Sequence, residues 1–395
     1  MPAGDLPIDL VHLITKLELG GAQLATLYEI EHSRVATGRR YLLFGPGGML
    51  EREARQLPGV RCVEVPELVR DISPILDGRA IVRVARLLRR LRRRGRRLVV
   101  HTHSSKAGVV GRCAAWIAGA DVVVHSIHGF GHHPWQPAFK YLPLLVAEQA
   151  TAHVTHGFTG DSEANLQRGR DEAIVGSIPA RVIRCGIDVE RFATPSRSAQ
   201  EVRAELNIAA GVPVVLGVAC LKPQKDPLAF VEVAKRVINQ RPDSVFLLAG
   251  DGELRGEVES RIRQAGLERA CRLLGWRRDI PDLLSASTVV AHTSRWEGLP
   301  QTFPQAMAAA RPIVATDVDG AREAITHQEN GLLFEVGEIE AMANGIVALV
   351  DDPERCRRMG ERGVAMARPF SRERMVDELD LFYDELLGSS RGGDQ

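Results

Sequence analysis

Short apolar runs alternate along the chain with longer stretches in which apolar residues recur at helical spacing. The first of these runs cover residues 8–14, 41–46, 98–103, 122–129 and 153–158. They are rich in β-branched residues and are separated by helix-like sequence, a pattern typical of a parallel sheet with helices on both faces. The first part of the chain is therefore predicted to be a doubly wound α/β domain.

The same alternation starts again after a polar span that begins near residue 194 and ends near residue 211. The later apolar runs cover residues 214–219, 245–252, 271–276, 289–294, 312–318 and 331–336. A chain of 395 residues is too long for one ordinary core, so two such domains are expected in tandem. We predict domains at residues 1–190 and 205–369 with a hinge near 186–211. A last amphipathic helix, residues 370–388, is expected to pack back towards the first domain.

In open parallel sheets, ligands bind in the crevice outside the carboxyl ends of the strands. Two such sheets facing each other would form a cleft lined by the loops that follow the strands. Seven candidate segments follow predicted strands in this way. They are GG at 20–21, HTHSSKAG from His101, IHGFG from Ile127, CLKPQK from Cys220, AGDGE from Ala249, GWRRD from Gly275 and WEGLPQTFPQAMA at 296–308.

The composition is that of an ordinary globular protein, with 45% hydrophobic residues and a net charge of +1. This charge excludes a globally basic nucleic-acid binder, so no nucleic-acid partner is expected. The six cysteines never form a CxxC pair, which predicts neither a zinc site nor a disulfide framework and favours a reducing cytoplasm. The start of the chain lacks the basic flank of a signal peptide, and no apolar run approaches the ~20 residues that span a bilayer. Any membrane contact is therefore expected to be peripheral.

One local cluster of charge stands out, because ten arginines lie between Arg79 and Arg97. An apolar stripe accompanies them, formed by Ile81, Val82, Val84, Leu87, Leu88 and Leu91. A basic amphipathic helix can lie on an anionic membrane surface, so residues 79–97 are a candidate for contact with the inner face of the cell membrane. The alternative is the solvated face of an ordinary domain helix.

Lysines and glycines follow the strands of the second domain. A cation such as Lys225 near the first turn of a helix is unfavourable for the helix dipole unless it faces an anion, and a diphosphate is one such anion. Lys222 precedes it, and exposed lysines are the alternative interpretation. Gly250 would let the chain turn beneath a ligand, although a plain turn also explains it. Trp276 could flank a nucleobase or simply pack.

Glu297 is the one carboxylate of the stretch 296–308, and it stands just before a glycine and an uncharged helix that should begin near Thr302. An uncharged helix keeps its positive end available to an anion.

Two glycine and histidine motifs belong to the first domain. Gly20 and Gly21 stand between a strand and a helix, where a backbone can approach a ligand closely, or where a tight turn is all that is needed. The motif is neither G-x-G-x-x-G nor a P-loop, which argues against a dehydrogenase or a P-loop enzyme. His128, with His132 and His133, does not match a recognised metal-ligand spacing, so it is interpreted as a hydrogen-bonding group for substrate hydroxyls.

These motifs together resemble bacterial retaining glycosyltransferases of family four, which have the GT-B fold. The resemblance is carried, in order over nearly the whole chain, by GGAQ, HTHSSKAG, HGFG, RCGIDVERF, KPQKDP, AGDGELR, LGWRRDI and SRWEGLPQTFPQAMAAARPIVATDVDG. In that family the second domain binds a nucleotide-diphospho-sugar, usually UDP-linked, and the first binds the acceptor. The resemblance therefore implies retaining transfer of a hexosyl or N-acetylhexosaminyl unit from a UDP-sugar to an acceptor hydroxyl, without a metal or another cofactor.

The family signature is a pair of glutamates eight positions apart, the first on the donor sugar and the second on the ribose hydroxyls. Glu297 matches the first, but Gln305 replaces the second. Cys220 stands where the family has an arginine five residues before its phosphate-binding lysine, and Lys222 is the candidate replacement. Ala310 stands where the family usually has glycine; in a left-handed conformation, alanine is strained by ~1 kcal/mol.

Site residues follow from the resemblance position by position. The expected catalytic residues are Glu297, His128 and Lys225. The expected donor-binding residues are Gly21, Lys222, Gly250, Trp276, Arg277, Gly298, Leu299, Thr302 and Gln305, with backbone amides from Gly298 onward meeting the β-phosphate. The expected acceptor-binding residues are Gly20, His103 and Lys106.

Three other functions stay open at this point. A UDP-sugar epimerase of the same architecture would convert its substrate without an acceptor. Cys220 and Gln305 would suit a non-catalytic paralogue with a degraded donor site. The arginine-rich helix would suit a peripheral membrane protein whose main activity is docking.

Overall fold

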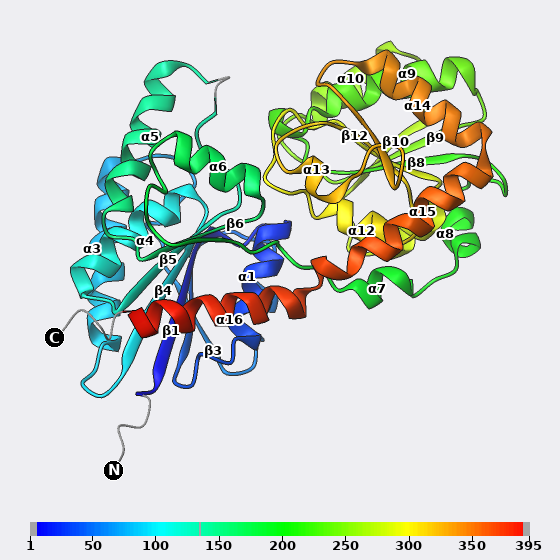
Figure 1. The fold of residues 1–395 in the computed structure, drawn as a ribbon. Coiled ribbons are helices and arrows are strands. Elements are labelled where there is room, and N and C mark those ends of the chain that lie inside the picture. The colour runs from blue at the N-terminus through cyan, green and yellow to red at the C-terminus, as the bar shows by residue number, and fades with distance from the viewer. Residues whose placement is uncertain (1–5, 134–135, 390–395) are drawn as a thin grey trace. The chain divides into compact units, whose positions relative to one another are not determined.

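The computed structural model describes residues 6–133 and 136–389. The chain divides into two compact units, Met1–Gly186 with Arg372–Gln395, and Ile187–Ser371. Each unit holds one parallel sheet covered by helices on both faces (Figure 1). The predicted fold class, two Rossmann-like doubly wound domains, is confirmed.

The sheet of the first unit has the strand order β3-β2-β1-β4-β5-β6-β7, and its pairs are parallel. The strands are β1 (Ile8–Lys16), β2 (Arg40–Gly45), β3 (Val60–Glu64), β4 (Arg97–His103), β5 (Val122–Ile127), β6 (Gly157–Gly160) and β7 (Ala180–Val182). Central strand β1 is buried along nearly its whole length because both faces are covered. The edge strands β3 and β7 were missing from the sequence prediction, since both are short and only partly buried and β3 carries two exposed charged residues, Arg61 and Glu64.

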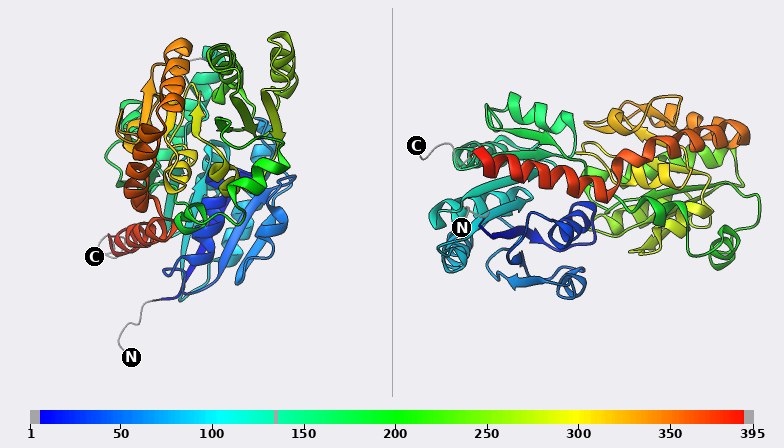
Figure 2. Two further views of the ribbon diagram at one scale, coloured as in Figure 1. Left: turned by 90° about the vertical axis from the view of Figure 1, so that its right-hand side faces the viewer. Right: turned by 60° about the horizontal axis from the view of Figure 1, so that its bottom comes forward.

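Helix α16 belongs to the first unit although it ends the described chain. The helices of this unit are α1 (Gly21–His32), α2 (Glu51–Ala54), α3 (Pro74–Leu91), α4 (Ser105–Ala118), α5 (Ala138–Ala152), α6 (Glu163–Asp171) and α16 (Arg372–Ser389). Met375, Leu379 and Tyr383 of α16 are buried in a cluster with residues of β1 and α1, and the helix can be followed from two further directions in Figure 2. The Asp380 carboxylate accepts hydrogen bonds from the Ser33 hydroxyl at 2.6 Å and from the backbone amide of Arg34 at 2.7 Å.

The arginine-rich helix begins before the predicted span of 79–97, at Pro74, and does not reach its end. Helix α3 ends at Leu91, and the chain then turns through Gly95, which has a φ of 78°, so that Arg97 can begin β4. Val84 and Leu88 of its apolar stripe lie in the core against α4. The side facing solvent carries most of the arginines, together with the exposed Ile75 and Val82. In the part of the chain that the structure describes, no helix is long and apolar enough to cross a membrane.

The sheet of the second unit has the order β10-β9-β8-β11-β12-β13, and each predicted apolar run of this unit forms one strand. The strands are β8 (Val214–Val218), β9 (Val245–Ala249), β10 (Cys271–Gly275), β11 (Val289–His292), β12 (Ile313–Thr316) and β13 (Gly331–Phe334). The helices are α7 (Val189–Ala193), α8 (Ala199–Glu205), η1 (Pro223–Lys225), α9 (Pro227–Gln240), α10 (Arg255–Gln264), α11 (Ile280–Ala286), α12 (Thr302–Ala308), α13 (Ala321–Ala324), α14 (Ile339–Asp351), α15 (Pro353–Ala367) and η2 (Arg368–Phe370).

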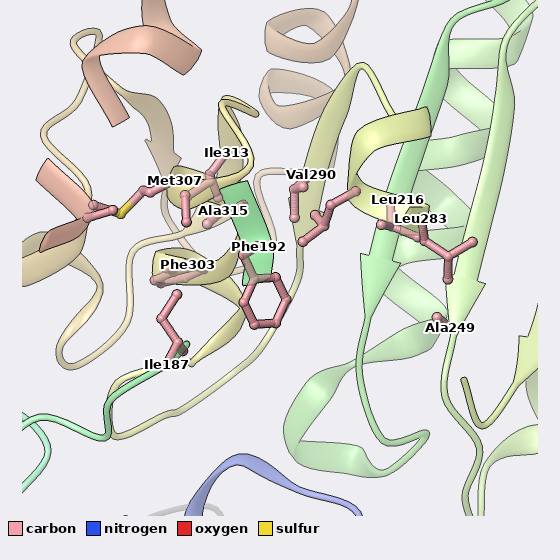
Figure 3. Packing of buried hydrophobic residues seen from close by; sticks show 14 of the residues in the cluster. Ile187, Phe192, Leu216, Ala249, Leu283, Val290, Phe303, Met307, Ile313 and Ala315 are labelled. Atoms are coloured by element: carbon pink, nitrogen blue, oxygen red, sulfur yellow. The ribbon is translucent and has the colours of Figure 1, made fainter. Parts of the chain in front are cut away.

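The short helix α12 is anchored in the core of the second unit. Phe303 and Met307 are fully buried there together with Leu216 of β8 and Val290 of β11 (Figure 3). The strand order of this sheet reverses between β8 and β11, and that of the first unit reverses between β1 and β4. Such topological switch points are where doubly wound sheets bind ligands, so the loops after these four strands define the candidate sites.

Candidate functional site

Lys225 and Glu297 form an ion pair at the switch point of the second unit. Lys225 ends the turn η1 that follows β8, and Glu297 lies in the loop between β11 and α12. Because β8 and β11 are hydrogen-bonded neighbours, the loops that follow them meet. The Lys225 ammonium contacts Oε1 of Glu297, and the two side chains are only 19% and 6% exposed. The sequence-predicted catalytic residues of this unit are thus in direct contact.

Two further side chains hold the Glu297 carboxylate. The Ser294 hydroxyl donates to Oε1 at 2.6 Å, and Nε2 of His292 lies 3.2 Å from the same oxygen. Burial by itself raises the pKa of the Glu297 carboxyl, but the Lys225 charge and the His292 hydrogen bond hold that pKa well below its usual value. Burial also lowers the pKa of His292, so its imidazole is neutral at pH 7 and donates through Nε2–H. The site therefore presents an ionised, oriented carboxylate.

The main chain around Glu297 is fixed from neighbouring loops. Its amide donates to Oδ2 of Asp319, which follows β12, at 2.6 Å. The carbonyl of Gly298 accepts from the amide of Gly320 at 3.2 Å, and the side-chain amide of Gln224 donates to the carbonyl of Trp296 at 3.0 Å. Three strand-end loops thus hold one another, which is the preorganisation that an electrostatic site needs.

Two buried backbone amides next to Glu297 donate no hydrogen bond within the described residues. Among the described residues, neither the amide of Gly298 nor that of Leu299 donates a hydrogen bond. Buried amides without protein partners are commonly satisfied by water or a bound anion. Thr302 begins α12 with its hydroxyl 3.4 Å from the Val218 carbonyl. One turn later Gln305 is half-buried, and no described residue bonds to its side-chain amide.

Gly250 brings the loops after β8 and β9 together. It has a φ of 135°, and a Cβ at this position would lie 1.9 Å from the carbonyl oxygen of Ala219. Only glycine fits there without moving the backbone. The neighbouring Leu221 amide donates to the Asp251 carbonyl at 3.0 Å, and this contact positions the segment that carries Lys222. Gly250 is thus a shaping residue of the loop that was predicted to bind phosphate.

Trp276 and Arg277 follow β10 and differ in their availability. The Trp276 side chain is 39% exposed, so its ring is accessible to a planar ligand. Arg277 donates to both carboxylate oxygens of Asp279, at 2.8 and 2.6 Å, and reaches Glu205 at 3.1 Å. The guanidinium is therefore engaged within the unit, and a donor contact would have to share it.

In the first unit, His128 follows β5, and both of its ring nitrogens have hydrogen-bond partners. Its Nδ1 lies 3.1 Å from each oxygen of Asp161 and 3.4 Å from the Cys185 sulfur, and its Nε2 lies 3.0 Å from Nδ1 of His103. Burial lowers the pKa of His128, but the Asp161 carboxylate more than offsets this and raises the pKa above its usual value. A direct substrate contact through this ring would have to replace one of these partners.

The predicted acceptor residues of the first unit lie in different settings. His103 is fully buried, with its Nε2 2.9 Å from Nδ1 of His12. Lys106 is 13% exposed and pairs with Asp77 at 2.7 Å, which ties α4 to the start of α3. Gly20 has an extended φ of −148° that any residue could adopt, and it precedes the helix α1 that Gly21 begins. Of the three predicted acceptor residues, Gly20 and Lys106 are partly exposed and His103 is buried; Gly21, predicted to bind the donor, is partly exposed beside Gly20.

Comparisons with known proteins agree with this arrangement. Residues 198–366 match the family described as "Glycosyl transferases group 1", and residues 32–191 match "Glycosyltransferase Family 4". The chain is 32% identical over 343 residues to the UDP-Gal:alpha-D-GlcNAc-diphosphoundecaprenol alpha-1,3-galactosyltransferase of Escherichia coli, which covers 83% of this chain and 85% of that protein. The chain belongs to glycosyltransferase family 4. It is accordingly a glycosyltransferase that acts on nucleotide sugars.

Other members and structures extend the comparison. The alpha-D-kanosaminyltransferase of Streptomyces kanamyceticus is 30% identical over 321 residues, which are 77% of this chain and 81% of that protein. Among solved structures, Anabaena HepE in complex with UDP-glucose superposes with a TM-score of 0.77 at 21% identity, covering 95% of this chain and 99% of that one. Sucrose-phosphate synthase from Thermosynechococcus elongatus reaches a TM-score of 0.81 at 20% identity, covering 96% and 100%. These likenesses confirm the GT-B fold.

Several residues of this glycosyltransferase that shape its sites were not predicted from the sequence. In the second unit they are Gln224, His292, Ser294 and Asp319, and in the first unit they are His12, Glu29, Asp161 and Cys185. Most stand at or just after the carboxyl end of a strand. That position was the available signal, but a strand end alone does not say which polar side chains turn towards one another.

Proposed function

We propose that this glycosyltransferase moves a hexosyl or N-acetylhexosaminyl unit from a UDP-sugar to an acceptor hydroxyl, with retention at the anomeric carbon. The observation that carries the proposal is the buried Lys225–Glu297 pair beside the unbonded amides of Gly298 and Leu299. In this proposal the second unit binds the donor and the first unit binds the acceptor.

Charge matching assigns roles within the donor site. The Lys225 ammonium and the two amides are donors that stabilise the negative charge of a diphosphate, with Lys222 as a second cation. When a donor binds, the Lys225 ammonium donates a hydrogen bond to a phosphate oxygen and interacts less with Glu297. Glu297 is then an ionised acceptor for sugar hydroxyls, held in place by Ser294 and His292.

The nucleoside half of the donor meets the remaining predicted residues. Gln305 offers a carbonyl acceptor and an amide donor to ribose hydroxyls, with Thr302 one turn before it. The exposed ring of Trp276 offers a face for the base. Arg277 contributes only to the extent that it leaves Asp279.

The proposed reaction balances without a metal ion or cofactor at the donor site. The acceptor oxygen bonds to the anomeric carbon on the face from which the diphosphate leaves, and the bond between that carbon and the β-phosphate oxygen breaks. The acceptor proton passes to the departing phosphate oxygen. Lys225 and the amides stabilise the charge that develops on the leaving group, which commonly contributes 10²–10³-fold or about 3–4 kcal/mol.

The acceptor we propose is a lipid-linked precursor of a cell-surface polysaccharide. The Escherichia coli relative is named for transfer to a diphosphoundecaprenol-linked sugar, and a Bacillus subtilis relative, the putative glycosyltransferase EpsD, is 27% identical over 292 residues. A small natural product is the second candidate, because the kanosaminyltransferase relative is nearly as similar.

The test combines donor, acceptor and variants. UDP release is measured with UDP-glucose, UDP-galactose and their N-acetylamino forms, in the presence of a polyprenyl-diphospho-sugar or an aglycone, and the product anomer is read by NMR. Lys225→Ala and Glu297→Ala should each lower kcat/KM by roughly 10²-fold or more, while Lys235→Ala, an exposed lysine of α9, should not change it. UDP-sugar conversion without acceptor would instead identify an epimerase. No UDP binding at millimolar concentration would identify a non-catalytic paralogue, and an inverted product would reject retention.

We also propose electrostatic contact of α3 with anionic lipid. Arg86 and Arg90 of α3, and Arg93 just after it, are exposed, whereas Val84 and Leu88 of the apolar stripe lie in the core. Since each basic residue near an anionic surface contributes about 1 kcal/mol, replacing all three by Gln should weaken binding to phosphatidylglycerol vesicles by roughly two orders of magnitude. The same replacement at Arg357, Arg358 and Arg362 of α15 is the matched control. Equal losses for both triple variants would reject the assignment of the contact to α3.

A further inference from the structure

A group of buried polar side chains in the first unit has no place in the proposed reaction. His12 lies on β1, Glu29 on α1, and His101 and His103 on β4. The three histidines are fully buried and Glu29 is 4% exposed. A carboxylate enclosed by imidazoles is costly to bury unless its oxygens are hydrogen-bonded or coordinate a cation.

The distances within this group are not those of a hydrogen-bonded carboxylate. Oε2 of Glu29 lies 3.8 Å from Nδ1 of His12 and 3.8 Å from Nε2 of His103, which is too long for hydrogen bonds. Among the described residues, this oxygen has no hydrogen-bond partner. The two histidine nitrogens lie 2.9 Å from each other. Three atoms with these separations surround a point about 2.1 Å from each, which is the length of Zn–N and Zn–O bonds.

We propose that Nδ1 of His12, Oε2 of Glu29 and Nε2 of His103 bind one Zn²⁺ ion inside the first unit. Two imidazoles and one carboxylate form a ligand set that suits zinc. The ligand atoms of these three residues and of His101 all lie within 4.8 Å of one another. We place His101 outside the ligand set, because its ring nitrogens already lie 2.5 Å from the Tyr383 hydroxyl and 2.7 Å from that of Ser126.

The second nitrogen of each ligating histidine also has a partner, as is usual for histidines that bind metal. Nε2 of His12 lies 3.3 Å from the Tyr383 hydroxyl, and Nδ1 of His103 lies 3.0 Å from Nε2 of His128. These partners fix which nitrogen of each ring faces Glu29. The ion would thus join β1, α1 and β4 and, through Tyr383, helix α16. The proposed ion belongs to the first unit, whereas Lys225 belongs to the second.

A second group, His128, Asp161 and Cys185, has ligand atoms equally close together. Their separations of 3.1 to 3.4 Å are those of ordinary hydrogen bonds, including one from the Cys185 thiol to Asp161. This group needs no ion to satisfy its polar atoms. The unbonded oxygen of Glu29 is what distinguishes the proposed site.

The first experiment measures metal in the full-length protein after expression with zinc and removal of loosely bound ions. We expect about one zinc per chain by plasma mass spectrometry, and a wild-type chain that holds none and takes up none on refolding with zinc overturns the proposal. Glu29→Gln and His12→Asn should lose the ion. His125→Asn removes another buried imidazole, on β5 and outside the group, and should keep it. A Glu29→Gln variant that folds and keeps a full equivalent of zinc overturns the assignment.

A second experiment decides the matter even where the ligand variants fail to fold. Wild-type protein refolded with Co²⁺ should show visible d–d bands of a nitrogen and oxygen site without a thiolate charge-transfer band, and a higher Tm than the metal-free protein. A thiolate band would place the ion at a cysteine, and an unchanged spectrum and Tm would show that no site exists; either result overturns the proposal. Tyr383→Phe removes the partner of His12, so it should weaken zinc binding roughly 10–100-fold in a chelator competition.

Discussion

Replacing Lys225 by methionine tests whether the Lys225–Glu297 pair is formed in the unliganded protein. The substitution keeps most of the volume of the side chain but removes the charge that faces Glu297. Breaking a buried ion pair from one side commonly costs 3–5 kcal/mol, because the partner stays behind as an uncompensated charge. Ser294 and His292 still donate to the carboxylate, and Lys225 is 19% exposed. We therefore expect a loss of about 3 kcal/mol, at the lower end of that range.

The loss should depend on pH in a defined direction. In the wild type the pKa of the folded Glu297 carboxyl lies below its usual value of 4.5, so the group contributes stability above about pH 4.5 and loses that contribution as the pH falls further. In Lys225→Met the burial that raises this pKa remains while the main opposing charge is gone. The variant carboxyl should therefore take up a proton at higher pH. The stability gap between the two proteins should be widest near pH 7 and narrow below pH 4.5.

Hydrogen exchange resolved by peptide is the appropriate assay, because a chain of two units does not unfold in one step. The amides of β8 and β11 report on the second unit, and those of β1 and β4 serve as an internal reference that should not change. The double variant Lys225→Met with Glu297→Gln removes both charges and should recover most of the lost protection, yet bind UDP roughly 30-fold more weakly than wild type. Equal protection of wild type and Lys225→Met at both pH values would refute the pairing.

Three other substitutions give separate checks. Gly250→Ala should disrupt the loop at Ala219 and weaken UDP binding, whereas Gly256→Ala, in open space on α10, should be neutral; equal UDP affinities would contradict the close contact. Gln305→Glu should strengthen UDP binding about fivefold in calorimetry, because a charged acceptor binds a ribose hydroxyl more strongly by ~1 kcal/mol; weaker binding would show that this side chain does not face the ribose. Ala310→Gly should raise the Tm by roughly 2–4 °C, because Ala310 has a positive φ of 55° that strains alanine by ~1 kcal/mol and does not strain glycine. A lowered Tm would contradict the strain.

The strands that the sequence pattern predicted are those with continuous apolar runs, including the partly buried edge strands β10 and β13. Each apolar run of the second domain became a strand, because a parallel sheet covered by helices needs continuous apolar segments. The pattern missed β3 and β7, where the sheet ends and one side of the strand meets solvent or a loop. It also extended α3 beyond Leu91, since arginines carry no signal for where a helix stops and the glycine turn at Gly95 was read as part of the run.

At Ala310 the family resemblance identified an unusual backbone position but not the cause of its conformation. The family usually has glycine there, and the position does have a left-handed φ of 55°. Helix α15 packs closely against this end of α12, because a Cβ at Gly360 of α15 would lie 2.1 Å from the Ala310 carbonyl oxygen. The backbone shape is therefore set by packing of α15 on α12, and alanine is tolerated with strain. Sequence comparison identified the position, but only the structure shows what imposes the conformation.

The polar partners could not be predicted because they depend on side-chain direction across three loops. Glu297 was found as the one acidic residue of its segment, yet its ionisation rests on Lys225, His292 and Ser294, which come from two different strands. An isolated carboxylate at 7% exposure would be protonated or would force the loop open. With these partners it stays charged and aligned, and it occupies Lys225, the lysine that we propose binds the diphosphate. A donor that supplies phosphate oxygens to Lys225 and hydroxyl donors to Glu297 satisfies both groups at once, whereas UDP alone satisfies only the lysine. If the second unit binds the donor as proposed, we expect this pair to favour the complete nucleotide sugar over UDP.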